Sequence, residues 1–255
     1  MDLTFPDVHC HLDQVEEPER AVEAALEAGV RPILAVGVDQ VSSERVLELR
    51  AKYPGLVLAA VGVHPSEIPG LNDAELKAEL DFVEKALSGA DALGEVGLDF
   101  RDAADETQRS RQRQALQQQL AWAERERKPL SVHCRRAEHD IVAVAADFTK
   151  RTGLGVNLHW FTHSEKLARV CAENGIYISP GPSILHSEPQ AVVASQVAAG
   201  LLLLETDSPV EYAGEAARPL WARRVAERLA ELRDLPIESL SDLLQANVKR
   251  YLGSS

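Results

Sequence analysis

Short apolar segments rich in β-branched residues alternate along the chain with longer segments in which apolar residues recur at helical spacing. This alternation is typical of repeated strand–helix units around a parallel sheet. The segments predicted as strands are Leu3–Asp7, Pro32–Val36, Leu56–Val63, Ala92–Val96, Leu130–His133, Gly155–His159, Ile176–Ser179 and Leu201–Glu205. The predicted helices are Pro18–Ala28, Ser42–Lys52, Asp73–Leu87, Thr107–Arg127, Ala137–Lys150, Ser164–Glu173, Glu188–Val197, Leu220–Leu232 and Pro236–Leu252.

Eight strand–helix units in 255 residues are the size of a (β/α)8 TIM barrel, an α/β fold. No linker rich in Pro, Gly or Ser divides the chain, which favours a single domain over residues 1–255. A doubly wound open sheet is the alternative. In a barrel, active sites lie at the carboxyl ends of the strands, so chemically important residues are expected there.

The balance of charges narrows the possible partners. Lys and Arg number 27 against 40 Asp and Glu, which gives a formal net charge of −13. Proteins that hold nucleic acid by a broad surface do so with many basic residues, and this composition excludes that mode of binding. A bound polyanion must therefore meet local positive charge.

Neither a transmembrane segment nor a signal peptide is predicted, so we expect a soluble, cytoplasmic protein that does not bind membranes. The three cysteines form no C-x-x-C pair, which indicates reduced thiols rather than disulfides or a thiolate zinc site. The closed barrel shows no obvious apolar seam, and a monomer is expected.

Two histidines, His9 and His11, end the first predicted strand. Side chains two residues apart on a strand point to the same side, so both imidazoles can bind one metal ion while Cys10 faces away. The alternative is that they are simply polar residues at a strand end.

Further ionisable residues follow the other predicted strands: His64, Glu95, His133, His159 and Asp207. Glu95 lies in an apolar strand beside glycines, which allow other groups to approach closely. Asp207 comes three residues after a run of four leucines, with Glu205 and Thr206 between. Taken singly, each histidine could be an ordinary buried or loop residue, and Asp207 could cap a helix. Their common placement at one end of the barrel favours a metal site, because a cation offsets the cost of burying them.

Imidazole and carboxylate ligands without thiolates suit zinc, manganese, iron or magnesium. Four histidines and two acids exceed the needs of one four-coordinate ion, so two divalent ions are expected. An acid shared between them would hold the ions about 3.5–4 Å apart and promote formation of a bridging hydroxide nucleophile.

Five motifs in this order resemble the TatD family of metal-dependent hydrolases, within the amidohydrolase-like barrels: D-V-H-C-H-L, G-V-H-P, G-E-V-G-L-D-F, H-C-R-R-A and L-L-E-T-D-S-P. The resemblance runs from Asp7 to Arg250. It implies one metal bound by His9, His11 and Asp207, a second bound by His133 and His159, and Glu95 bridging the two. It also implies that Asp207 is the catalytic acid/base, and that His64 at the mouth contacts substrate.

Arg135 directly follows the fifth-strand motif's His133 and Cys134, and its forked donors could clamp a phosphate. A salt bridge to a neighbouring helix is the other interpretation of this residue.

Two segments depart from the family pattern and leave the substrate open. After the sixth-strand histidine the family usually has Cys-Phe-Ser-Gly, whereas this chain has Trp160-Phe161-Thr162-His163. After Asp-Ser-Pro the family usually has an Arg-Gly-Lys-x-Asn stretch, whereas residues 210–218 of this chain have a different sequence. Basic and amide groups are thereby lost from a loop at the mouth of the barrel. Trp160 and Phe161 either stack on a base or form a core aromatic pair.

Three functions are compatible with these residues. The first is a TatD-like deoxyribonuclease, a 3'-5' exonuclease that binds ends of single-stranded DNA or RNA transiently and uses the two metal ions. The second is hydrolysis of a small amide, a lactone or an aminoacyl ester, since the same nucleophile attacks carbonyls. The third, a metal-binding scaffold without activity, is disfavoured because all six proposed ligands are present.

Overall fold

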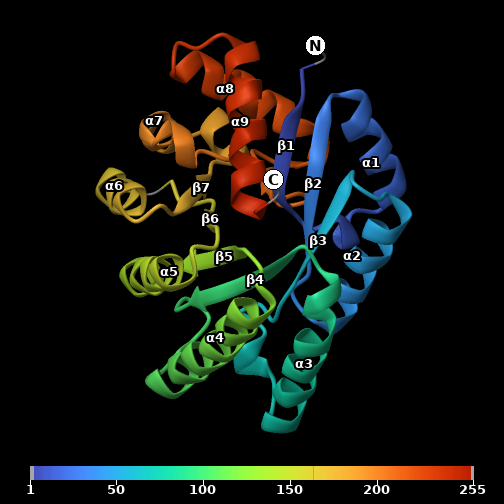
Figure 1. The fold of residues 1–255 in the computed structure, drawn as a ribbon, viewed down its shortest axis with the longest axis vertical. Coiled ribbons are helices and arrows are strands. Elements are labelled where there is room, and N and C mark those ends of the chain that lie inside the picture. Colours follow the sequence, from blue (N-terminus) through green and yellow to red (C-terminus); the bar gives the residue numbers. More distant parts are fainter. Residues whose placement is uncertain (1–2, 163, 254–255) are drawn as a thin grey trace.

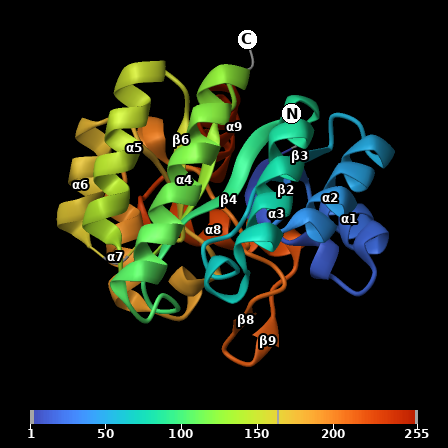
Figure 2. The same cartoon turned by 90° about the horizontal axis from the view of Figure 1, so that it is seen from below.

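A computed structural model describes residues 3–162 and 164–253 as a ring of parallel strands surrounded by helices (Figures 1 and 2). The strands pair in chain order and are β1 Phe5–Cys10, β2 Val30–Val36, β3 Val57–Val61, β4 Ala92–Asp99, β5 Leu130–Arg135, β6 Val156–His159 and β7 Tyr177–Ser179. The helices are α1 Pro18–Glu27, α2 Gln40–Lys52, α3 Asp73–Ala86, α4 Glu106–Glu126, α5 Glu138–Thr152, α6 Glu165–Glu173, α7 Glu188–Gln196, α8 Ala222–Leu232 and α9 Ile237–Leu252. Neighbour-to-neighbour pairing in chain order excludes the doubly wound alternative.

The predicted eighth strand, Leu201–Glu205, is corrected by the structure. Leu201 belongs to a 3₁₀ turn, Ala199–Leu201, and the backbone after it is extended but not a regular strand. This backbone nevertheless bonds to β7 through Leu203 N to Ile178 O (3.0 Å) and Glu205 N to Pro180 O (3.2 Å), and to β1 through Val8 N to Leu204 O (3.0 Å) and Asp207 N to His9 O (2.9 Å). The ring is therefore closed, and the (β/α)8 TIM barrel prediction is confirmed with an irregular eighth position.

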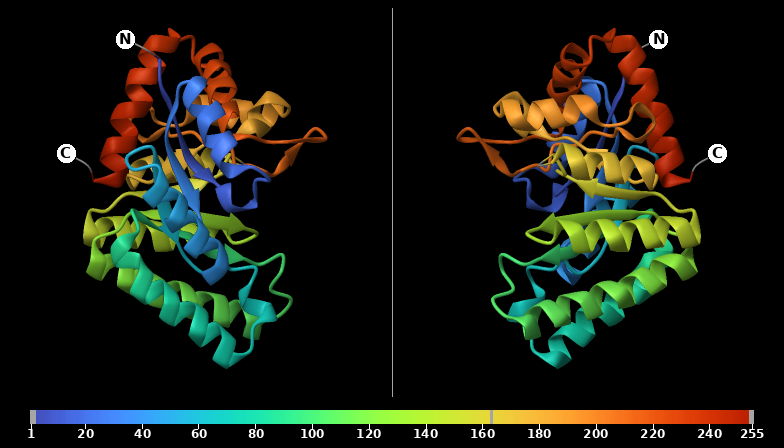
Figure 3. Two further views of the ribbon diagram at one scale, coloured as in Figure 1. Left: turned by 90° about the vertical axis from the view of Figure 1, so that its right-hand side faces the viewer. Right: turned by 90° about the vertical axis from the view of Figure 1, so that its left-hand side faces the viewer.

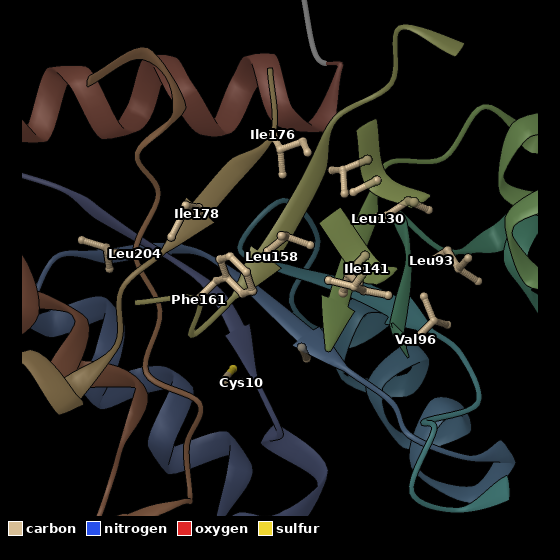
Figure 4. Close-up of a cluster of buried hydrophobic side chains, with 14 of the residues drawn as sticks. Cys10, Leu93, Val96, Leu130, Ile141, Leu158, Phe161, Ile176, Ile178 and Leu204 are labelled. Carbon is tan, nitrogen blue, oxygen red and sulfur yellow. The ribbon is translucent and has the colours of Figure 1, made fainter. Parts of the chain in front are cut away.

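The core lies between the strands and the surrounding helices. Figure 4 shows part of it, where Leu93, Leu130 and Leu158 come from three successive strands. Phe161 is also there and is only 2% exposed, so it is a core residue. Cys10 is fully buried in the same cluster, as expected for a side chain that faces away from the two histidines.

A small hairpin, β8 Glu211–Tyr212 and β9 Glu215–Ala216, was not predicted from the sequence. It projects from the barrel on the side toward which the strand arrows point (Figure 3). Ala213 and Gly214 at its tip both have positive φ angles, as a type I′ turn requires. Strands of two residues are too short to produce a recognisable alternation, which is why sequence periodicity missed them.

Among the residues that the structure describes, no helix is both long enough and apolar enough to cross a membrane.

Gly97 in β4 permits the close approach of β5. Its φ angle is +153°, and a Cβ atom at this position would lie 2.0 Å from the main-chain oxygen of His133. We expect Gly97→Ala to lower the free energy of unfolding by about 1–3 kcal/mol or more, because the two strands must move apart. Urea unfolding measures this, with Gly89→Ala as the control because nothing lies within 4 Å of the Cβ there. Equal stabilities of the two variants would contradict the prediction.

Candidate metal centre

The barrel brings all six predicted metal ligands together at the carboxyl ends of its strands. They are His9 in β1 and His11 just after it, Glu95 in β4, His133 in β5, His159 in β6, and Asp207 in the turn after the closing segment. The cavity above them has a volume of about 510 Å³, and its walls include His64, Arg135, Trp160 and Val210. This is the end of the barrel at which active sites occur.

Glu95 lies between two sets of imidazoles, and its Oε2 atom faces the first set. That oxygen is 3.3 Å from His9 Nε2 and 3.6 Å from His11 Nε2. Asp207 completes this side, with Oδ1 3.4 Å from His11 Nε2 and 3.7 Å from His9 Nε2. Two imidazoles and two carboxylates thus converge on one small volume.

The other oxygen of Glu95 faces the second set. Its Oε1 atom is 2.8 Å from His133 Nδ1 and 2.9 Å from His159 Nε2. His64 Nε2 also lies close, at 3.2 Å from the same oxygen. The family resemblance implied that His64 lies at the mouth and contacts substrate. In the structure His64 lines the cavity, and its ring packs against that of His133, with centroids 4.4 Å apart.

These donors fit divalent cations. The ligand atoms of His9, His11 and Glu95 lie within 4.8 Å of one another, and the same holds for His9, His159 and Asp207. The Nε2 atom of His9 is buried without a hydrogen-bond partner among the described residues. Because an unpaired buried nitrogen is costly, a cation among these groups is a chemically sound partner for it.

At His9 and Glu95 the electrostatics of the cluster favour the protonation states that metal ligands need. Burial, together with the neighbouring His159, lowers the pKa of His9 to about 4 and keeps it neutral at pH 7. Burial opposes ionisation of Glu95, but the histidines around it hold the pKa of its carboxyl well below its usual range. A neutral imidazole and an ionised carboxylate are the ligand forms of these side chains.

The imidazoles of His11, His133 and His159 behave differently while no cation is bound, because neighbouring carboxylates raise the pKa of each. For His11, burial alone would lower the pKa, but the adjacent Asp207 and Glu95 raise it to about 9. A bound metal ion must therefore displace a proton from His11, so metal affinity is expected to fall as the pH falls.

Two buried carboxylates orient the histidines of the second set. Asp99 Oδ2 lies 3.1 Å from His133 Nε2, which leaves Nδ1 of that ring directed at Glu95. Glu205, fully buried, has Oε1 3.4 Å from His159 Nδ1, and its Oε2 accepts a hydrogen bond from Ser179. Carboxylates in such outer positions fix the ring orientation of metal-binding histidines.

Asp99 and Glu205 lie within the sequence motifs G-E-V-G-L-D-F and L-L-E-T-D-S-P, but no role was predicted for them. For Glu205 a signal existed, because it precedes Asp207 by two residues and an extended backbone directs such side chains to the same side. Asp99 carried a similar signal, because it follows Glu95 by four residues in one strand and alternation directs both side chains to the same side.

Asp7 fixes the segment that carries Asp207. Its Oδ1 accepts a hydrogen bond from Thr206 N (2.9 Å), and its Oδ2 accepts one from the Thr206 hydroxyl (2.6 Å). Asp7 is fully buried, and burial raises its pKa to about 8. This contact joins the first strand to the closing segment of the barrel at Thr206, the residue next to Asp207.

Arg135 is exposed at the end of β5 and lines the cavity. The ion pairs formed among residues 3–162 and 164–253 do not involve it; the nearby Asp140 pairs with Arg113 instead. Its guanidinium is thus available to an anionic group in the cavity, and the helix salt bridge considered from the sequence is not formed.

We expect Asp99→Asn to weaken binding of one metal ion by about 10–100-fold, because an amide cannot match the charge that orients His133. Isothermal titration with Mn²⁺ measures this. The control is Asp102→Asn, an exposed carboxylate in the loop that follows β4. If both variants bind metal as the parent does, Asp99 has no part in the centre.

Comparison with known proteins agrees with this architecture. The family model described as TatD related DNase matches residues 6–253. The metal-dependent hydrolase YjjV of Escherichia coli is 33% identical over 97% of this chain and 97% of its own, and the crystal structure of YjjV superposes with a TM-score of 0.83 over 97% of both chains. The 3'-5' ssDNA/RNA exonuclease TatD of Edwardsiella piscicida is 28% identical over 91% of each chain. A match across nearly all of the strands and helices described above leads to one conclusion: the chain belongs to the TatD family of metal-dependent hydrolases.

Proposed function

We propose that this protein is a metal-dependent phosphodiesterase that removes nucleotides from the 3' ends of single-stranded DNA or RNA. The observation that carries the proposal is the position of Glu95, whose two oxygens face separate sets of histidines at the floor of a cavity. A carboxylate shared in this way is the central feature of a two-metal site. The exonuclease named among the relatives supports a nucleic-acid substrate.

The proposed ligands divide into two groups around Glu95. His9, His11 and Asp207 would hold one divalent ion, and His133 and His159 the second. Metal ions so held would lower the pKa of a water molecule and stabilise the attacking and leaving oxygens of a phosphodiester. Magnesium, manganese and zinc all accept this donor set.

The chain's own groups supply the proton transfers and the orientation of the substrate. Burial disfavours the charged form of Asp207, but the surrounding histidines lower its pKa, so its carboxylate is ionised and able to accept a proton at pH 7. In our proposal it takes the proton of the attacking water and returns it to the leaving oxygen. Arg135 would bind a phosphate oxygen with its forked donors, and His64 would contact the scissile group beside Glu95.

The net charge of −13 limits how the substrate is held. Contacts are proposed only with the end of a strand, not along an extended basic surface. Monomeric state, cytoplasmic location and a single domain over residues 1–255 stay predictions.

The test uses single-stranded DNA labelled at one end and incubated with the purified protein after treatment with EDTA. We expect no cleavage in EDTA, and a ladder of shortening products after Mg²⁺ or Mn²⁺ is added. Moving the label to the other end gives the polarity: progressive shortening of 5'-labelled strands is expected.

Intact strands under all metal conditions would contradict the proposal. Hydrolysis of a lactone, amide or aminoacyl ester by the same preparation would then favour the second function. A protein that binds metal but cleaves none of these substrates would be a scaffold.

A further inference from the structure

Trp160 and Phe161, adjacent in sequence, have different surroundings. Phe161 is buried in the core, whereas Trp160 is only partly buried and lines the cavity above the metal centre. Trp160 directly follows His159, and its φ angle of 47° lies in the left-handed region that a bulky residue rarely adopts. The strained backbone thus separates the two aromatic side chains and leaves the indole at the cavity wall.

The indole is held in place by neighbours outside the cavity. Its Nε1 atom donates a hydrogen bond to Gln190 Oε1 (3.1 Å), and the hydroxyl of Thr162 donates to the same oxygen (3.1 Å). The ring lies 5.3 Å from that of Tyr212, with an interplanar angle of 52°. A side chain already fixed in this way loses little conformational entropy when a ligand packs against it.

The cavity offers three kinds of chemistry side by side. Its floor is the carboxylate and imidazole cluster around Glu95, and the cationic Arg135 lines it from the end of β5. Trp160 and Val210 form an apolar part of the wall, and both pack on the cluster of Tyr212 and its neighbours. A complementary ligand carries an anionic ester next to a flat apolar group.

A nucleotide has this composition, and a volume of about 510 Å³ is in the usual range for one small-molecule ligand rather than a duplex. A small lactone or amide would use the floor but leave the aromatic wall without a partner. Stacking on an aromatic ring also tolerates any base, because every base has a π-face.

We propose that Trp160 is the stacking platform for the nucleobase at the scissile end of the strand. The inference rests on the proposed function and makes it more specific: the enzyme recognises an unpaired terminal base together with its phosphate. Trp160 is then a specificity-determining residue, because it distinguishes an end that carries a base from one that does not.

The test compares two oligonucleotides that differ only at the end that is cleaved. One has an ordinary terminal nucleoside, and the other has a propanediol unit in its place. For Trp160→Ala we expect kcat/KM to fall by about 10–100-fold on the ordinary end and by a much smaller factor on the base-less end. Trp160→Phe should retain most of the activity, since it keeps an aromatic face.

The matched control is Leu235→Ala, an exposed apolar residue beside Leu3 before β1, at the opposite end of the barrel. It should behave as the parent on both substrates. If Trp160→Ala lowered kcat/KM by the same factor on both oligonucleotides, the residue would have a structural role and the inference would be overturned. Unchanged cleavage of the oligonucleotide with the ordinary terminal nucleoside would also overturn it.

A binding measurement decides the inference even if the parent cleaves neither substrate, a result that would count against the proposed function alone. The protein has three tryptophans, and Trp122 and Trp221 are buried. In a buffer that contains Ca²⁺, dAMP should quench the tryptophan fluorescence of the parent, and deoxyribose 5-phosphate should not. The Trp160→Phe variant should show no quenching by dAMP. Equal quenching by both ligands, or quenching that survives in the variant, would contradict stacking on Trp160.

Discussion

Glu95→Gln is expected to lower kcat by about 10³-fold or more and to reduce the bound metal from two ions to one or none. Glu95 is 2% exposed, and its two oxygens face different pairs of histidines. An amide offers one neutral oxygen and one nitrogen, so it cannot serve both sides. The loss of one ion removes stabilisation of either the attacking or the leaving oxygen.

Steady-state cleavage of labelled DNA measures kcat for Glu95→Gln, and elemental analysis of the dialysed protein counts the ions. Glu126→Gln at the end of α4 provides a control outside the cavity, because it removes a carboxylate without touching the histidines. A variant that keeps two ions and normal cleavage would refute the bridging role.

Asp207→Asn is expected to lower kcat by about 10²–10⁴-fold while changing KM much less. Asparagine keeps an oxygen near His9 and His11, so a metal ligand remains, but it cannot accept a proton. The proposed general acid/base contribution is therefore lost, whereas the proposed contact of Arg135 with substrate is retained. This separates the effect from that of Glu95→Gln, in which metal binding fails first.

Steady-state kinetics of Asp207→Asn over a range of Mn²⁺ concentrations supply the measurement. Saturating Mn²⁺ should not rescue kcat, because the missing function is proton transfer. Asp81→Asn, an exposed carboxylate on α3, is the control and should match the parent. Full rescue by Mn²⁺ would instead make Asp207 a ligand without a role in proton transfer.

The barrel and its site could be predicted together because both follow from one rule. Apolar segments of strand length alternate with helical segments, and parallel strands place their carboxyl ends at the same edge. Residues such as His133 and Asp207 therefore converge although they are far apart in the chain. The spacing of His9 and His11 adds the direction in which the first pair points.

Features that depend on register and backbone geometry could not be predicted. The contact between Asp99 and His133 requires the observed alignment of β4 with β5, which contains a register shift between Leu93 and Val96. The separation of Trp160 from Phe161 follows from one residue with a positive φ angle, and sequence alternation carries no signal for it. The irregularity of the closing segment could not be predicted either, because a run of leucines does not distinguish a regular strand from extended backbone.

The hydrogen bonds from Thr206 to Asp7 join residues 199 positions apart, and the proposed ligands His9 and Asp207 lie on the same two segments. A metal ion bound there would act as a cross-link across the seam of the barrel, since no unfolded chain holds these groups together. By mass action, a ligand that binds only the native state raises its stability by RT ln(1 + [L]/Kd). Catalytic competence and resistance to unfolding would then rise with the same metal concentration, so depletion of the ion removes both at once.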